Sequence, residues 1–180
     1  MQDQDLRSGA LQQMAIFGGV DEKALHFLLA RSRTCSYARG IYITREGETG
    51  TGLFLLLQGR IAVQRRWDEH QVLLRELGAG ECFGEMALLD LGRRSASVLA
   101  LEDCQVLEMD TGLLHEFFEH DTRQFALMQM NIARELSRRL RITFNTLFSA
   151  ASANEREVIE RLLRQGGALP SPAADALSRN

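Results

Sequence analysis

The feature that most constrains the fold is a succession of short strand-like segments between Thr34 and Asp110, separated by glycine-containing turns. Short apolar or alternating runs that end in glycines and polar doublets are typical of antiparallel strands joined by tight turns. We predict about eight such strands, with tight hairpins at residues 58–59 and 68–70. Small antiparallel sheets protect their edges by closing. We therefore expect an α+β protein that is mainly β, built on a closed or nearly closed, jelly-roll-like antiparallel β-roll.

Helical patterns flank this β region on both sides. Residues 11–17 show helical spacing, and residues 22–30 form a second predicted helix that Asp21 can cap. Beyond the roll, Asp110 is placed to cap a short helix, and residues 123–150 contain neither proline nor glycine. The pattern predicts N-terminal helices and one long C-terminal helix.

Composition and charge exclude several classes of function. The 180 residues are 45% hydrophobic and 25% charged, an ordinary globular mixture. Because the net charge is −3, there is no overall basic field to attract nucleic acid, and we expect no direct DNA binding. The longest apolar run is too short to cross a bilayer, and the N-terminus has no signal-peptide pattern. We expect a cytoplasmic protein without membrane contact.

The cysteines, histidines, glycines and serines of the chain do not show the spacing that metal, dinucleotide or catalytic sites require. The three cysteines and four histidines lack metal-ligand spacing, so we expect reduced thiols and neither a metal nor a cofactor. Gly78, Gly80 and Gly84 are not followed by the long helix that a dinucleotide site requires. Ser95 and Ser97 have no histidine nearby in the sequence. We do not expect an enzyme.

The middle of the chain instead carries groups suited to a small anionic ligand. Gly84 permits close backbone approach, and the turn after it begins with free N–H groups that favour an anion. Arg94 offers a charged planar fork for phosphate oxygens, with the hydroxyl of Ser95 beside it. Glu85, which only accepts hydrogen bonds when ionised, suits a sugar hydroxyl. The alternative is a surface ion pair between Glu85 and Arg94 in an ordinary loop.

The order of residues in this segment resembles the phosphate-binding cassette of cyclic nucleotide-binding domains. That cassette reads Gly-Glu-Leu/Met-Ala-Leu, a short turn, and then Arg, a small residue, Ala, Thr/Ser and Val. The matching positions are Gly84, Glu85, Met86, Ala87, Leu88, Arg94, Ser95, Ala96, Ser97 and Val98. The resemblance implies that Arg94 and Ser95 hold the cyclic phosphate, that Glu85 binds the ribose 2′-hydroxyl, and that the backbone of Gly84 meets the sugar edge.

The long helix carries two apolar stripes. One has the alternating three- and four-residue spacing of a two-stranded coiled-coil seam and consists of Ala133, Leu136, Leu140, Thr143 and Leu147. The other lies beside it and consists of Phe125, Met128, Ile132 and Phe144. A single wide face buried within one subunit is the alternative. We expect a homodimer through residues 123–150, because two stripes favour a second partner and the simplest partner is another copy.

Residues 138–143 resemble the central helix of the catabolite activator branch of this family, in which a threonine meets the adenine amino group. This resemblance implies cyclic AMP, whereas Ser95, whose hydroxyl touches guanine in some members, leaves cyclic GMP open. Phe144 departs from the branch, which has a serine from the partner subunit there. The ligand-binding residues that we expect are Phe83, Gly84, Glu85, Met86, Ala87, Arg94, Ser95, Ala96 and Thr143.

The resemblance spans residues 16–148, which we take as a cyclic nucleotide-binding domain that includes the long helix. Residues 1–15 form a polar, helical lead, and residues 151–180 a short helix and a disordered tail. We expect a stand-alone sensor that relays ligand binding through its C-terminal helices to an unidentified protein partner. The alternatives are a ligand-degenerate roll that serves protein interaction and dimerisation, and a cyclic di-GMP receptor that uses Arg93 as its second cation.

Overall fold

The computed structural model describes residues 11–68, 70–151 and 155 of the chain. The chain divides into two compact units, Met1–Glu135 and Leu136–Asn180. The predicted short helix and tail within residues 151–180 lie almost entirely outside the described residues. Among the helices that the structure does describe, none is long and apolar enough to cross a membrane.

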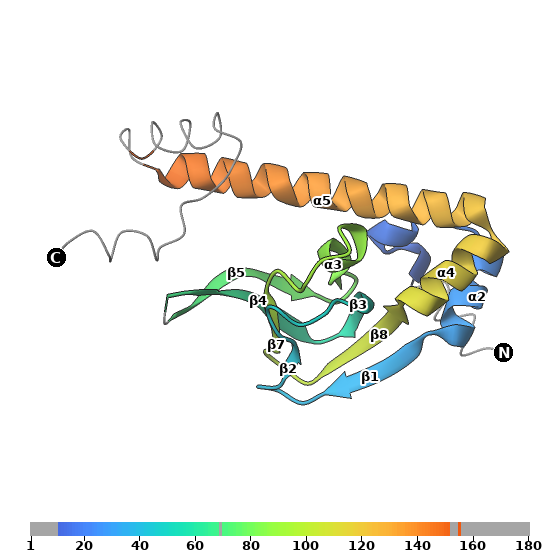
Figure 1. Cartoon of the computed structure of the whole chain (residues 1–180), viewed down its shortest axis with the longest axis horizontal. Coiled ribbons are helices and arrows are strands. Elements are labelled where there is room, and N and C mark those ends of the chain that lie inside the picture. Colours follow the sequence, from blue (N-terminus) through green and yellow to red (C-terminus); the bar gives the residue numbers. More distant parts are fainter. Residues whose placement is uncertain (1–10, 69, 152–154, 156–180) are drawn as a thin grey trace. The chain divides into compact units, whose positions relative to one another are not determined.

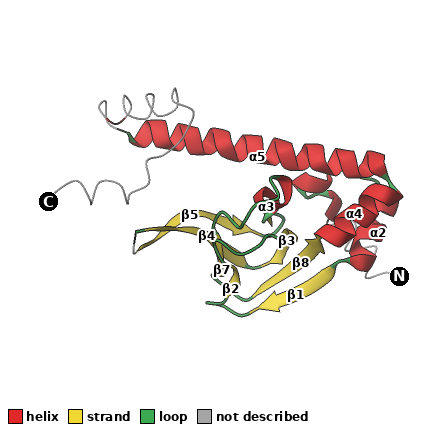
Figure 2. Ribbon diagram, in the orientation of Figure 1, coloured by secondary structure: helices red, strands yellow, loops and turns green. Residues whose placement is uncertain are grey.

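The first unit contains two antiparallel sheets with helices around them (Figure 1; Figure 2). The helical elements of the described chain are the 3-10 helix η1 (Ala15–Phe17), α2 (Glu22–Arg31), α3 (Glu85–Leu89), α4 (Thr111–His120) and α5 (Thr122–Ala150). The strands are β1 (Arg33–Tyr37), β2 (Tyr42–Thr44), β3 (Gly52–Gln58), β4 (Arg60–Trp67), β5 (His70–Gly78), β6 (Cys82–Phe83), β7 (Ser97–Ala100) and β8 (Cys104–Asp110). Helices α2 and α4 lie side by side, close to the start of β1 and the end of β8 (Figure 1).

The strands form one sheet in the order β1-β8-β3-β6 and another in the order β2-β7-β4-β5. Every pair is antiparallel. Inward-facing residues of both sheets share one core cluster, made of Phe54, Leu56, Ile61, Leu77, Phe83, Val98, Ala100, Cys104 and Val106. The antiparallel roll predicted from the glycine-punctuated pattern is therefore confirmed.

One of the two predicted hairpins is wrong. The turn at residues 68–70 does join paired strands, since Trp67 and His70 are register partners in β4 and β5. By contrast, β3 and β4 lie in different sheets, so the turn at Gly59 is a corner between sheets. Gly59 has φ 94°, and a Cβ there would lie 2.7 Å from the carbonyl oxygen of Asp103. A tight glycine turn suits a corner as well as a hairpin, and the choice depends on pairing partners remote in the sequence.

Polar contacts tie the first half of α5 to the N-terminal helical elements. The Asp21 backbone N–H donates to Oε1 of Gln124 at 3.1 Å, and Nε2 of Gln124 donates to Oδ2 of Asp21 at 3.0 Å. About two turns further along, Nδ2 of Asn131 donates to the carbonyls of Ile16 (3.2 Å) and Gly18 (2.8 Å). These contacts hold the beginning of the long helix within the first unit.

The predicted cap of the short helix is confirmed and can be tested. Oδ1 of Asp110 accepts from the backbone N–H of Leu113 at 2.7 Å, at the start of α4. Asp110→Ala should lower the free energy of unfolding by about 1 kcal/mol, because a helix donor loses its acceptor. Urea denaturation measures this loss. Asp110→Asn keeps an acceptor and should lose less; equal losses in both variants would show that the cap is not responsible.

Candidate ligand-binding site

The central segment begins where β6 ends. The ring of Phe83 stacks on that of Phe54 with centroids 5.1 Å apart, and the two residues are register partners in β6 and β3. Gly84 follows as the N-cap of α3 in the left-handed region, with φ 80°. A Cβ there would collide with Nη1 of Arg94. Glycine is therefore required twice, for its backbone conformation and for the close approach of the guanidinium.

Arg94 is only 5% exposed and is held from several directions. Its Nη1 donates to the carbonyl of Gly52 at 3.0 Å and to that of Gly84 at 2.9 Å. Its guanidinium carbon lies 5.1 Å from the centroid of the Phe54 ring, within the range of a cation–π contact. The guanidinium is thus fixed between the start of β3 and the N-terminus of α3.

The backbone on either side of Arg94 is also fixed. Its N–H donates to the carbonyl of Glu48 at 2.8 Å, and its carbonyl accepts from the N–H of Gly47 at 2.9 Å. Nη1 of the neighbouring Arg93 donates to the carbonyl of Gly47 at 2.8 Å. The turn before β3 therefore anchors the second half of the segment, so that Arg94 is positioned by main chain as well as side chain.

Burial lowers the pKa of Arg94 below its ordinary value, because a charge is less stable away from water. The carboxylates of Glu108, Glu48 and Glu85 oppose this shift, Glu108 most strongly. The ordinary pKa of arginine is so high that the guanidinium remains a cation at pH 7. A buried cation is costly unless anions compensate it, and an anionic ligand would add to that compensation.

Glu85, the first residue of α3, is also only 5% exposed. A carboxylate in the first turn is favoured by the positive end of the helix dipole. Since Arg94 bonds the carbonyl of Gly84, the structure brings the predicted cation to the peptide group that links Gly84 and Glu85. The alternative of a surface ion pair in an ordinary loop is wrong, because both side chains are buried.

The remaining predicted residues of the segment have different surroundings. Ser95 is exposed, and its hydroxyl donates to the sulfur of Met86, itself exposed, at 3.6 Å. Ala87 is buried against Gly50, where a Cβ would collide with that of Ala87. Ala96 is half-buried. Small residues thus allow the segment to pack closely, while the Ser95 hydroxyl stays accessible.

Thr143 belongs to the second unit. Its hydroxyl donates to the carbonyl of Arg139 at 3.0 Å, one turn earlier in α5, as a solitary helix threonine commonly does. Its contact with a ligand base stays a prediction.

The structure adds residues that the sequence pattern did not single out. Gly52 supplies an acceptor for Arg94, and a Cβ at Gly52 would lie 2.5 Å from the carbonyl oxygen of Met109. The only signal for Gly52 was its closeness to Gly50 at the start of β3, a spacing that predicts only a loosened chain. Phe54 and Glu108 carried no signal, because their relation to Arg94 exists only after the sheets form.

Known proteins show the same domain. The sequence model of the family described as cyclic nucleotide-binding domain matches residues 34–121. The cyclic AMP receptor protein of Thermus thermophilus is 33% identical over 156 residues, which cover 84% of this chain and 70% of that protein. The CRP-like cAMP-activated global transcriptional regulator of Mycobacterium tuberculosis is 29% identical over 138 residues, covering 76% of this chain and 60% of the regulator. This chain thus matches well over half of each relative's length.

Solved structures agree with this assignment. The catabolite activator protein of Thermus thermophilus superposes with a TM-score of 0.66 and 29% identity, covering 84% of this chain and 72% of that one. A cyclic nucleotide-binding domain from Methylobacillus flagellatus has a TM-score of 0.75 at 18% identity, covering 84% and 86%, and this likeness shows the fold alone. From its sequence relatives and its fold together, this chain belongs to the cyclic nucleotide-binding domain family.

Proposed function

We propose that this protein is a cyclic nucleotide sensor, most favourably for cyclic AMP, which relays binding through its C-terminal helix to a partner protein. The observation that carries the proposal is the buried guanidinium of Arg94, held by the carbonyls of Gly52 and Gly84 beside the start of α3. A cation in such a position is stabilised by an anion. A cyclic phosphate has the negative charge and the pair of exocyclic oxygens that a guanidinium fork can bond.

The proposed site offers hydrogen-bond donors to the phosphate of the ligand and an acceptor to its ribose. Nη1 of Arg94 supplies both carbonyl contacts, and a guanidinium has five N–H donors, which leaves donors of the fork for phosphate oxygens. The accessible hydroxyl of Ser95 adds a further donor. Glu85 would accept from the ribose hydroxyl at the other end. Cyclic AMP is preferred to cyclic GMP because both relatives described above are named for cyclic AMP, and because Thr143 supports the same choice.

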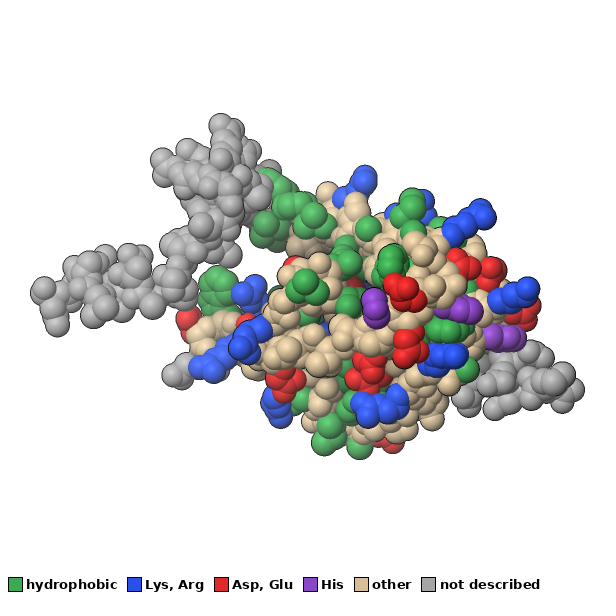
Figure 3. Space-filling model, turned by 45° about the vertical axis from the view of Figure 1, so that its right-hand side comes forward, with side chains coloured by type: hydrophobic (Ala, Val, Ile, Leu, Met, Phe, Trp, Pro, Cys, Tyr) green, Lys and Arg blue, Asp and Glu red, His purple; other side chains and the backbone are tan. Residues whose placement is uncertain are grey.

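The cyclic dinucleotide alternative has less support. Its second phosphate needs another cation beside Arg94, and Arg93 is bonded instead to the carbonyl of Gly47 at 2.8 Å. On the face shown in Figure 3, basic and acidic side chains of the described residues are interspersed.

Thermal unfolding with cyclic AMP, cyclic GMP and cyclic di-GMP tests the function. Cyclic AMP should raise the Tm most, because it is the ligand that we expect to bind most tightly. A ligand present at 100 times its Kd stabilises the native state by about 2.7 kcal/mol, and a weaker ligand at the same concentration stabilises it less. A larger shift with cyclic GMP would show that the base assignment is wrong. No shift with any of the three, at millimolar concentration, would favour the ligand-degenerate interaction module.

We also propose that α5 pairs with the same helix of a second copy. Beside the seam, Met128 and Ile132 are fully buried. On the seam, Leu140 is 54% exposed and Leu147 43% exposed. An apolar stripe with coiled-coil spacing that is open to solvent is suited to another helix, and a twofold dimer is the commonest solution. Ligand binding can act through this helix only if the bound and free states place it differently.

Leu140→Glu should convert the dimer to a monomer, because it places two charges in an apolar seam. Light scattering after size exclusion should report a mass near 20.2 kDa for this variant and about twice that mass for the natural protein. Asn145→Glu is the matched control, since Asn145 is exposed and lies off the seam. A natural protein that is already monomeric at high concentration would exclude the paired helix.

A further inference from the structure

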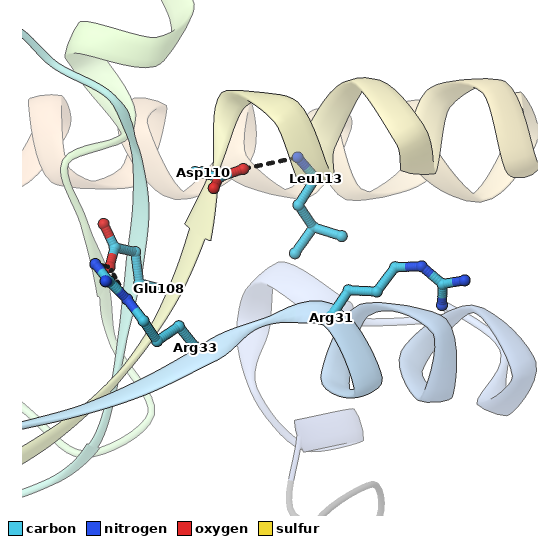
Figure 4. A pocket seen from close by; sticks show the side chains of 5 residues that line it. All are labelled: Arg31, Arg33, Glu108, Asp110 and Leu113. Atoms are coloured by element: carbon cyan, nitrogen blue, oxygen red, sulfur yellow. Dashed lines mark hydrogen bonds and ion pairs between the residues drawn. The ribbon is translucent and has the colours of Figure 1, made fainter.

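A second charged pair lies next to the core cluster. Arg33 of β1 and Glu108 of β8 are register partners, and Nε and Nη2 of Arg33 both donate to Oε2 of Glu108, the former at 3.0 Å. Cys35 and Val106, each two residues away on the same strands, belong to the core or pack against it. Because side chains alternate along a strand, Arg33 and Glu108 occupy inward-facing positions. Figure 4 shows the two side chains meeting and Arg31 pointing elsewhere.

Glu108 is connected to the phosphate site through Phe54. Glu108 of β8 and Phe54 of β3 are register partners, and the guanidinium of Arg94 lies over the ring of Phe54. Of the carboxylates that oppose the burial-induced fall in the pKa of Arg94, that of Glu108 has the largest effect. Phe54 is therefore next to both groups: it pairs with Glu108 across the sheet and contacts the guanidinium of Arg94.

The two members of the pair differ in their contact with solvent. The side chain of Glu108 is 14% exposed and that of Arg33 is 74% exposed. They border a cavity of about 230 Å³, which is also lined by Arg31, Asp110 and Leu113 (Figure 4). The charge of Glu108 thus acts through the protein interior, where screening is weak, whereas Arg33 neutralises it from the solvent side.

An inward-facing charge on an edge strand is also a known device against unwanted strand pairing, and β1 is an edge strand. That explanation accounts for Arg33 alone. It does not account for Glu108, which lies on the interior strand β8, beside the aromatic ring that Arg94 contacts.

We propose that the Arg33–Glu108 pair adjusts the affinity of the phosphate site for its ligand. Arg33 determines how much of the negative charge of Glu108 remains unneutralised near Arg94. The inference rests on the proposed cyclic nucleotide function. An unneutralised Glu108 competes with the cyclic phosphate for Arg94, and Arg33 reduces that competition. The pair positions charge and need not touch the ligand.

The test is a charge cycle measured by titration calorimetry with cyclic AMP. Arg33→Gln should weaken binding and Glu108→Gln should strengthen it, each by about three- to tenfold, the size expected for one unit charge acting over several ångströms of partly solvated path. The double variant should return to within about twofold of the natural affinity, because it removes one charge of each sign and so leaves the same net charge beside the site as the natural pair. Raising the salt from 0.05 M to 0.5 M should shrink the effect of Arg33→Gln more than that of Glu108→Gln, since the screening length in solution falls about threefold but the largely buried Glu108 is screened less. Arg31→Gln, at the same cavity but bonded elsewhere, is the control and should leave affinity unchanged.

The outcomes separate this inference from the function on which it rests. If both single variants weaken binding and lower the free energy of unfolding together, the pair is structural and the proposal is wrong. Unchanged affinities in both would leave only edge protection, and also overturn it. In either case the proposed function stands, because the natural protein binds. Absence of binding by the natural protein would remove the function itself.

Discussion

Arg94→Ala is expected to reduce the affinity for cyclic AMP by about thirtyfold or more, since loss of one partner of a desolvated charge pair costs roughly 2–5 kcal/mol. The effect should be this large because Arg94 is buried, fixed by two carbonyls and rigidly placed against Phe54. Calorimetry measures the affinity directly, and competition with labelled ligand extends the range.

The fold should survive this change. Alanine leaves the carbonyls of Gly52 and Gly84 without their side-chain donor, but it also removes a cation that burial destabilises. The opposing effects should keep the change in unfolding free energy within about 2 kcal/mol. Arg39→Ala is the matched control, because it removes an exposed arginine in the turn between β1 and β2, outside the segment. An Arg94→Ala variant that is folded and binds cyclic AMP normally would refute the assignment of the phosphate site.

Arg94→Lys separates charge from geometry. Lysine keeps the positive charge but has no planar fork, so it cannot bond two carbonyls and a phosphate in the same arrangement. We expect its affinity to lie between those of the natural protein and the alanine variant. An affinity equal to that of alanine would mean that the fork, not the charge, determines binding.

Features encoded by neighbouring residues could be predicted from the sequence. The caps at Asp21 and Asp110 are confirmed, because each bonds a backbone N–H only three residues away. The central segment was recognisable for the same reason, since its glycine, carboxylate and arginine lie close together in the chain. Strand positions followed from the glycine turns, which limit each strand independently of its partners.

Features that depend on pairing could not be predicted. Whether Gly59 turns a hairpin or a corner is decided by β8 and β7, which follow some forty residues later in the chain and pair with β3 and β4 respectively. The surroundings of Arg94 have the same origin: Phe54 and Glu108 become its neighbours only when β3 and β8 align. A single sequence contains no local mark of such contacts, so the presence of Phe54 and Glu108 beside Arg94 had to come from the structure.

Gly84→Ala is the second substitution expected to have a large effect, on both stability and binding. A left-handed conformation costs an alanine roughly 1–2 kcal/mol. Its Cβ would also collide with Nη1 of Arg94 and lie 3.2 Å from the carbonyl oxygen of Gly52. The guanidinium must then leave its two carbonyls, so affinity for cyclic AMP should fall by about tenfold or more, as for loss of a charge-assisted contact.

Gly40→Ala isolates the contribution of backbone strain. Gly40 has φ 84°, close to the 80° of Gly84, but a Cβ there meets nothing within 4 Å. This variant should lose stability by a similar strain and bind cyclic AMP normally. In an Arg94→Ala background the collision with Nη1 no longer exists, so Gly84→Ala should then cost the strain measured at Gly40 plus the smaller cost of the tight contacts with Gly52 and Phe54, both at 3.2 Å. A larger cost in that background would show that the glycine serves the packing of the turn itself, and not the placement of Arg94.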